Sequence, residues 1–157
     1  ICNQYTTGDI IINMDDDDYY PPTRISHAVD VLTKNPNIYC AGISKIHIYF
    51  KINDILGILG PLSHNHACSG SLAFKRDLLK ITSYNNESKD VEHFDFLLKY
   101  NLPIIHLDSL KTMIALSHRS NTSTNYNLVN NNKTILLDKE KLEDYIQDEE
   151  ILKLWKL

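Results

Sequence analysis

The sequence predicts an α/β fold in which a mixed, mostly parallel sheet is flanked by helices. Short apolar stretches alternate along the chain with stretches whose apolar residues recur at helical spacing, the order of elements expected of layered α/β folds. The chain has 157 residues, 43% hydrophobic and 23% charged, which is enough for one domain with a buried core.

The first half of the chain contains three predicted strands and one predicted helix. Residues 9–14 form a continuous apolar run, typical of a strand covered on both faces. Pro21 and Pro22 favour a helix start, because a missing N–H costs nothing in the first turn, and Asn35-Pro36 ends that helix. Its apolar residues at helical spacing are Ile25, Ala28, Val29 and Leu32. Strands are predicted near 38–43 and over 45–51, where apolar and polar residues alternate.

The second half is predicted to contain shorter elements. Residues 53–71 indicate a loop, because they include Gly57, Gly60, Pro61 and Gly70. The following segments predict, in order, a strand at 72–74, a brief helix at 76–81, a helix over 90–100, and strands at 104–107 and 112–117. Residues 121–133 are polar and low in complexity, which indicates a loop. From Asp138 the sequence predicts a charged helix whose apolar stripe consists of Leu142, Tyr145, Ile146, Leu152 and Trp155.

Composition excludes several functional classes. The net charge is −4 and no Lys- or Arg-rich stripe occurs, which argues against nucleic acid as a partner. The apolar runs are far shorter than the roughly 20 residues that a transmembrane helix needs. Cys2, Cys40 and Cys68 are too scattered for a disulfide framework, which favours reduced thiols and a cytoplasmic location. Because the first residue is Ile1 rather than Met, we expect the chain to begin inside a larger protein.

The acidic run Asp15–Asp18 is the feature that says most about function. Four adjacent carboxylates repel one another unless a cation or water absorbs their charge. The run follows a buried strand, and open α/β sheets bind ligands at the carboxyl ends of strands. Oxygen ligands suit Mg²⁺ or Mn²⁺, which usually bind together with substrate phosphates. We therefore predict a site for a metal ion and a diphosphate. The alternative is a solvated turn that caps the next helix. An EF-hand loop would need a Glu where Ser26 stands.

The segment from Gly8 to Pro22 resembles the core of family-2 glycosyltransferases with the GT-A fold. Those enzymes carry a GDxIxxxDxDD…P stretch that contains their DXD motif, and the matching residues here are Asp15 and Asp17. The resemblance implies that Asp15 faces the ribose and metal of a sugar nucleotide and that Asp17 ligates the metal. It also places Asp16 in the donor site.

Two further segments resemble the family, and they follow one another in the same order along the chain as in the family. Residues 67–76 resemble the small-residue stretch before an F-x-R sequence, which implies that Ser69, Gly70 and Arg76 contribute to donor binding. Residues 117–122 resemble the segment with a late histidine, which implies that His118 completes the metal shell.

Residues 91–99 resemble the helix start that carries the catalytic base of these enzymes. The resemblance implies Glu92 as the base, with Asp90 and Asp95 as alternatives. His93 stands where the family usually has its catalytic aspartate. It could itself act as the base, because the ordinary pKa of histidine, about 6.5, lies close to working pH.

The resemblance implies a metal-dependent, inverting glycosyltransferase of the hexosyltransferase type. Its donor would be a UDP- or GDP-sugar, its cofactor Mn²⁺ or Mg²⁺, and its acceptor a hydroxyl group of a glycan, lipid or protein. Residues 1–122 would form the C-terminal, catalytic part of a partial GT-A-like domain that lacks the N-terminal nucleotide-binding units. Residues 123–157 would add a polar loop and an amphipathic helix.

Two other functions are compatible with the same residues. A non-catalytic sugar- or nucleotide-binding module would keep the fold without the base. A nucleotidyltransferase would use the carboxylates at a phosphoryl centre, but it would need a phosphate loop rich in Gly, Arg and Lys that the chain does not show. The group His64, His66 and Cys68 lacks a fourth ligand for zinc and is predicted to be a structural turn or an acceptor loop. Tyr19 and Tyr20 are predicted to be packing residues, with stacking on a sugar face beside the metal as the alternative.

Overall fold

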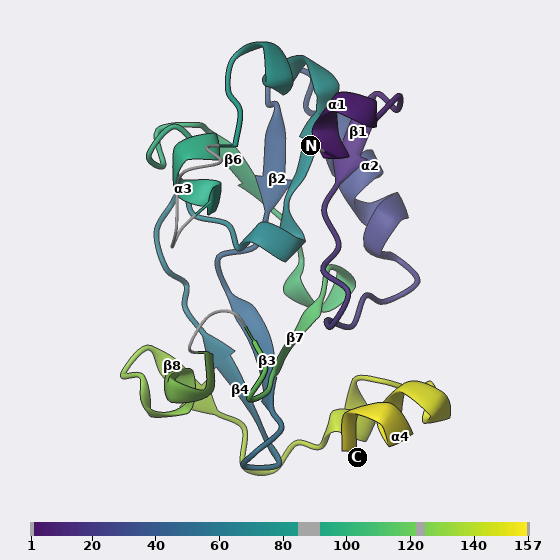
Figure 1. Ribbon diagram of the computed structural model, residues 1–157, viewed down its shortest axis with the longest axis vertical. Coiled ribbons are helices and arrows are strands. Elements are labelled where there is room, and N and C mark those ends of the chain that lie inside the picture. Colours follow the sequence, from purple (N-terminus) through teal and green to yellow (C-terminus); the bar gives the residue numbers. More distant parts are fainter. Residues whose placement is uncertain (1, 85–91, 122–124, 157) are drawn as a thin grey trace.

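The computed structural model describes residues 2–84, 92–121 and 125–156. They form two four-stranded sheets that lie one above the other in Figure 1. The upper sheet has the order β1 (Ile10–Ile12), β5 (Ala73–Lys75), β2 (Cys40–Gly42) and β6 (Ile104–His106). The lower sheet has the order β7 (Ile114–Ser117), β3 (Ile46–Phe50), β4 (Ile55–Leu59) and β8 (Thr134–Leu136).

The prediction of one mostly parallel sheet is wrong. In the described part of the chain only β2–β6 and β3–β7 are parallel, and the pairs β1–β5, β2–β5, β3–β4 and β4–β8 are antiparallel. The missed strands β4 and β8 account for much of this difference. Gly57 indicated a loop, yet it lies inside β4. Glycine is needed at this strand position because a Cβ would come within 2.9 Å of the Phe50 ring on β3.

One short helix before β1 was not predicted, and the other helices follow the predicted order but are shorter. The chain contains α1 (Cys2–Tyr5), α2 (Arg24–Lys34), α3 (Glu92–Phe96) and α4 (Glu149–Lys156). Short 3₁₀ turns occupy 69–71, 76–80, 109–111, 125–130 and 142–144. Helix α3 ends early because Leu98, Lys99 and Tyr100 adopt positive φ angles between 51° and 62°. Among the described helices none is long and apolar enough to cross a membrane.

The predicted single C-terminal helix is divided into a 3₁₀ turn and α4. Asp148 marks the division, since its side chain accepts hydrogen bonds from the backbone N–H groups of Glu150 and Ile151, as a helix N-cap does. Helix α4 is attached to the lower sheet through Trp155, which is 4% exposed and stacks on Tyr49 with ring centroids 6.0 Å apart. The C-terminal segment is therefore part of the packed structure.

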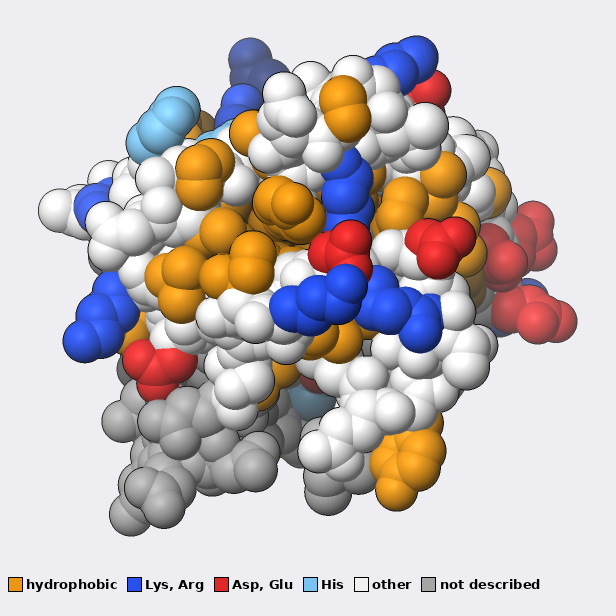
Figure 2. Space-filling view, turned by 90° about the horizontal axis from the view of Figure 1, so that it is seen from above, with side chains coloured by type: hydrophobic (Ala, Val, Ile, Leu, Met, Phe, Trp, Pro, Cys, Tyr) orange, Lys and Arg blue, Asp and Glu red, His pale blue; other side chains and the backbone are white. Residues whose placement is uncertain are grey.

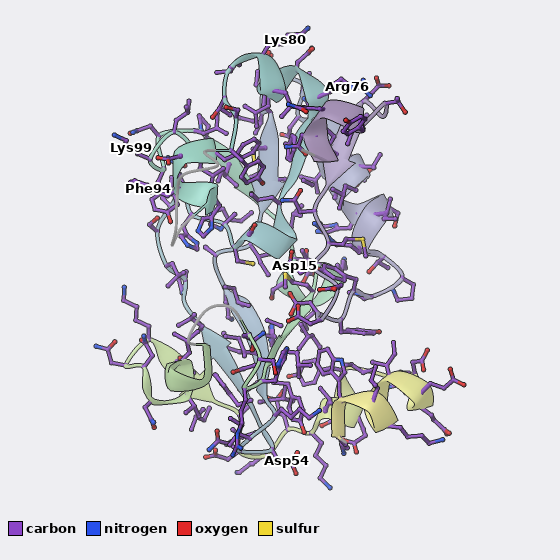
Figure 3. All side chains as sticks on the ribbon, viewed as in Figure 1. Asp15, Asp54, Arg76, Lys80, Phe94 and Lys99 are labelled. Atoms are coloured by element: carbon purple, nitrogen blue, oxygen red, sulfur yellow. The ribbon has the colours of Figure 1, made fainter. Side chains whose placement is uncertain are left out.

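The end of the molecule that carries Arg76 and Lys80 lies farthest from the lower sheet (Figure 3). Figure 2 shows this end, where basic side chains lie beside a hydrophobic patch with carboxylates between them. Lys80, for example, pairs with Asp77 at 2.6 Å. Charges of both signs are thus mixed on this face.

Candidate active site

The acidic turn that follows β1 is fixed to the lower sheet. Tyr19 and Ile114 exchange two backbone hydrogen bonds of 3.0 and 2.9 Å. The Asp18 carboxylate accepts a hydrogen bond from the backbone N–H of Leu116 at 2.9 Å. The turn therefore lies where the two sheets meet, as the position of Asp15 in Figure 3 shows.

The carboxylates of this turn have different surroundings. Asp18 is half-buried, and its burial raises its pKa to about 7, with a further contribution from the charges of Asp17 and Asp15. The Leu116 N–H acts in the opposite direction. Asp15 and Asp16 are exposed. Because Asp18 is only partly ionised near neutral pH, the repulsion within the turn is reduced.

Asp17 lies against a turn from the far end of the chain. Its Oδ2 atom accepts a hydrogen bond from Nε2 of His118 at 3.1 Å, and these residues are 101 positions apart. Nδ2 of Asn121 donates to the same oxygen at 3.0 Å, while Oδ1 of Asn121 accepts the backbone N–H of His118 at 2.6 Å. The structure thus brings together two of the three residues predicted as metal ligands, Asp17 and His118, and it adds Asn121.

The hydrogen bonds of His118 define its tautomer. Nδ1 accepts the backbone N–H of Ser120 at 3.2 Å, so the neutral ring carries its proton on Nε2 and donates it to Asp17. Ligation of a cation by Nε2 would require this proton to leave. As arranged here, His118 orients Asp17.

The predicted donor residues Asp15, Ser69 and Gly70 lie together. Gly70 is so close to the acidic turn that a Cβ there would lie 2.6 Å from Oδ2 of Asp15. The side-chain amide of Asn13 donates to the backbone oxygen of Ser69 at 3.2 Å. Arg76 is not part of this group: its guanidinium donates to the backbone oxygen of Gly8, at the other end of β1.

A pocket of about 930 Å³ opens beside the turn. One wall is polar and includes Asp16, Asp17 and His118. The apolar part of the lining includes Ile52, Ile151, Leu154 and Trp155. Helix α4 therefore contributes to a site for which the sequence predicted no role of the C-terminal segment.

The predicted base residues lie on α3, away from this pocket. The side chain of Glu92 and all of Asp90 lie outside the described residues. Neither His93 nor Asp95 is among the residues that line the pocket in the described part of the chain. In Figure 3 the labelled α3 residue Phe94 is well separated from Asp15. The structure therefore does not bring the described base candidates to the acidic turn.

His93 instead belongs to a group of histidines. Its Nε2 atom lies 3.3 Å from the hydroxyl of Tyr100, and its ring is edge-on to His66 with centroids 5.3 Å apart. Burial, together with the nearby His93 and His106, lowers the pKa of His66 to about 4. His66 is therefore neutral at physiological pH.

Sequence reasoning missed Asn121 and Arg24, and it assigned Tyr20 to packing or to stacking on a sugar rather than to hydrogen bonding. Asn121 lies three residues after His118, a spacing that suits a local side-chain-to-backbone turn, so this signal was available. Arg24 gave no such signal, because an arginine at the start of a helix is usually exposed; here it is 1% exposed.

The side chains near the acidic turn bear on whether a metal ion can bind there. In the described residues no group of three or more His, Cys, Asp or Glu side chains is arranged to hold a metal ion. Mg²⁺, however, is commonly bound by one or two carboxylates together with substrate phosphates and water. The carboxylates of Asp15 and Asp17 are chemically suited to that mode.

Comparison with protein families gives a match to part of the chain. The model of glycosyl transferase family 2 matches residues 1–80. This range contains the acidic turn and Gly70 but neither His118 nor α4. No curated protein and no solved structure matches the chain.

Proposed function

The chain belongs to glycosyl transferase family 2, and from this premise we propose that it transfers a hexosyl group from a UDP- or GDP-sugar to a hydroxyl acceptor with the help of Mn²⁺ or Mg²⁺. Family membership makes it a glycosyltransferase in general. The donor, the metal and the hexosyl group are the proposed details. The acceptor hydroxyl would belong to a glycan, a lipid or a protein, and a partial GT-A-like arrangement is proposed for the fold.

The contact between Asp17 and His118 is the observation that carries the proposal. These residues were chosen from separate sequence segments, and they meet at 3.1 Å beside a pocket large enough for a nucleotide sugar. Asp15 and Gly70, two of the residues predicted to bind the donor, lie so close together that a Cβ at Gly70 would come within 2.6 Å of Oδ2 of Asp15.

Asp15 and Asp17 would hold the cation, with the donor diphosphate and water completing its shell. When bound, the cation would neutralise the charge on the departing nucleoside diphosphate. His118 and Asn121 would keep Asp17 oriented by the hydrogen bonds that they donate to its Oδ2 atom.

The transfer itself needs a base that takes the proton of the acceptor hydroxyl as this oxygen attacks the anomeric carbon. Glu92 is proposed for this role, with Asp95 and His93 as alternatives, and a single displacement would invert the anomeric centre. The free thiols of Cys40 and Cys68 support a reducing, cytoplasmic setting as part of the proposal.

The test is release of UDP or GDP from a panel of nucleotide sugars in the presence of Mn²⁺ and simple sugar acceptors. We expect release by the wild-type chain and a loss of at least about 100-fold in Asp17→Asn, because a metal ligand is removed. Unchanged release by Asp17→Asn would refute the assignment of the site.

A non-catalytic module is the second candidate function. It is favoured by the position of His93 and Asp95, which do not line the pocket in the described residues. Such a module would bind the nucleotide with Mn²⁺ but release no nucleoside diphosphate from any donor, so the same assay separates the two functions.

A further inference from the structure

The hydroxyl of Tyr20 lies between the two segments from which donor-binding residues were predicted. It accepts a hydrogen bond from the backbone N–H of Asp15 at 2.6 Å and donates one to the backbone oxygen of Gly70 at 3.3 Å. Burial raises the pKa of Tyr20, so the hydroxyl keeps its proton at neutral pH and can accept and donate at once. A single side-chain atom therefore links Asp15 to Gly70.

The contact that this hydroxyl holds is a close one. A Cβ at Gly70 would lie 2.6 Å from Oδ2 of Asp15 and 2.9 Å from the Tyr20 hydroxyl. Because both neighbours are already at contact distance, even a methyl group would displace one of them. The space for the Asp15 carboxylate thus depends on the absence of a side chain at Gly70, while the Tyr20 hydroxyl fixes the backbone N–H of the same residue.

The backbone beneath this contact is fixed independently. The backbone N–H of Asn13 donates to the oxygen of Leu72 at 2.9 Å. Nη2 of the buried Arg24 donates to the oxygens of Ser71 at 2.9 Å and of Asn13 and Leu72 at 3.2 Å. These bonds hold the two segments together without involving Asp15, so removal of the Tyr20 hydroxyl should leave the fold in place.

We propose that Tyr20 is a positioning residue: its hydroxyl holds the backbone of Asp15 against Gly70 and thereby keeps the Asp15 carboxylate where it binds the donor diphosphate and its metal. This inference rests on the proposed function. Tyr20 acts through Asp15, and its hydroxyl reduces the reorganisation that binding would otherwise require. The expected signature is weaker binding of the metal–nucleotide complex with an intact fold.

The test compares Tyr20→Phe with Tyr49→Phe in the full chain. Tyr49 is a matched control, since its hydroxyl also makes a side-chain hydrogen bond, 2.8 Å to Oδ1 of Asp54, and it does not line the pocket. Calorimetric titration with UDP and with GDP in the presence of Mn²⁺ gives the Kd, and thermal unfolding gives the Tm. We expect the Kd to rise about tenfold in Tyr20→Phe and less than twofold in Tyr49→Phe, with similar small decreases in Tm.

Gly70→Ala provides a second route to the same contact. It should raise the Kd as well. In the double variant with Tyr20→Phe, the fold-increase in Kd should be smaller than the product of the two single increases, because both changes act on Asp15. Equal Kd values for Tyr20→Phe and Tyr49→Phe, or fully multiplicative losses in the double variant, would overturn the inference. If the wild-type chain binds neither nucleotide, the proposed function fails and the inference fails with it.

Discussion

Replacement of Asp18 by Asn should stabilise the protein at alkaline pH and have little effect at acidic pH. The Asp18 carboxyl has its pKa raised by burial from 3.8 to about 7. Between these values the folded chain holds a proton that the unfolded chain has lost, so the free energy of unfolding falls as the pH rises from about 4 to about 7. An Asn at this position carries no charge, and its side-chain oxygen can still accept the N–H of Leu116.

The size of the effect follows from the pKa difference. Each pKa unit corresponds to about 1.4 kcal/mol, so a full shift to about 7 would cost about 4 kcal/mol at pH 8. Asp18 is half-buried, and partial solvation lowers this value. We therefore expect Asp18→Asn to gain about 2 to 4 kcal/mol at pH 8 and less than about 0.5 kcal/mol at pH 4.

Urea denaturation at pH 4 and pH 8, without divalent cations, measures this difference. Asp16→Asn is the control, because it removes one charge of the same run from an exposed position. A gain at pH 8 no larger than that of Asp16→Asn, or an equal gain at both pH values, would show that Asp18 is not held in a buried, protonation-favouring position.

Three further predictions concern other parts of the site and the fold. Between about pH 6.5 and pH 4 the unfolded chain takes up a proton on His66 that the folded chain does not, so the free energy of unfolding falls as the pH falls. His66→Phe should remove about 3 kcal/mol of this loss, and an unchanged pH dependence in urea denaturation would contradict it. Asn121→Ala should weaken Mn²⁺-dependent nucleotide binding about tenfold, since Asp17 loses one of its orienting donors, and an unchanged calorimetric Kd would exclude that role. Trp155→Ala should reduce the free energy of unfolding by about 3 to 5 kcal/mol, and a loss below about 1 kcal/mol would mean that α4 is not anchored by this ring.

The elements that were predicted correctly are those with a clear local sequence pattern. The apolar run before the acidic turn forms β1, and the helical spacing after Pro22 forms α2. β4 was missed because Gly57 resembles a loop residue in the sequence, and its need for glycine arises from Phe50 on the neighbouring strand. A long-range contact of this kind has no local signal.

The sequence predicted those site residues that belong to a recognisable motif. The acidic run and the family resemblance identified Asp17 and His118, and the structure joins them. The role of Tyr20 depends on Gly70, which is fifty residues away, and could not be read from either segment alone. Arg76 was misplaced because its position after β5 fixes it to the other end of β1.

The most direct test of the proposed metal–diphosphate site is the binding of UDP and GDP, measured by calorimetry with and without Mn²⁺, in the wild-type chain, Asp17→Asn and Asp9→Asn. Asp9 is an exposed carboxylate at the opposite end of β1 and serves as the control for lost charge. We expect one nucleotide to bind only with Mn²⁺, Asp17→Asn to abolish this binding, and Asp9→Asn to retain it. Binding that persists in Asp17→Asn, or that is the same without Mn²⁺, would contradict a metal–diphosphate site at the acidic turn.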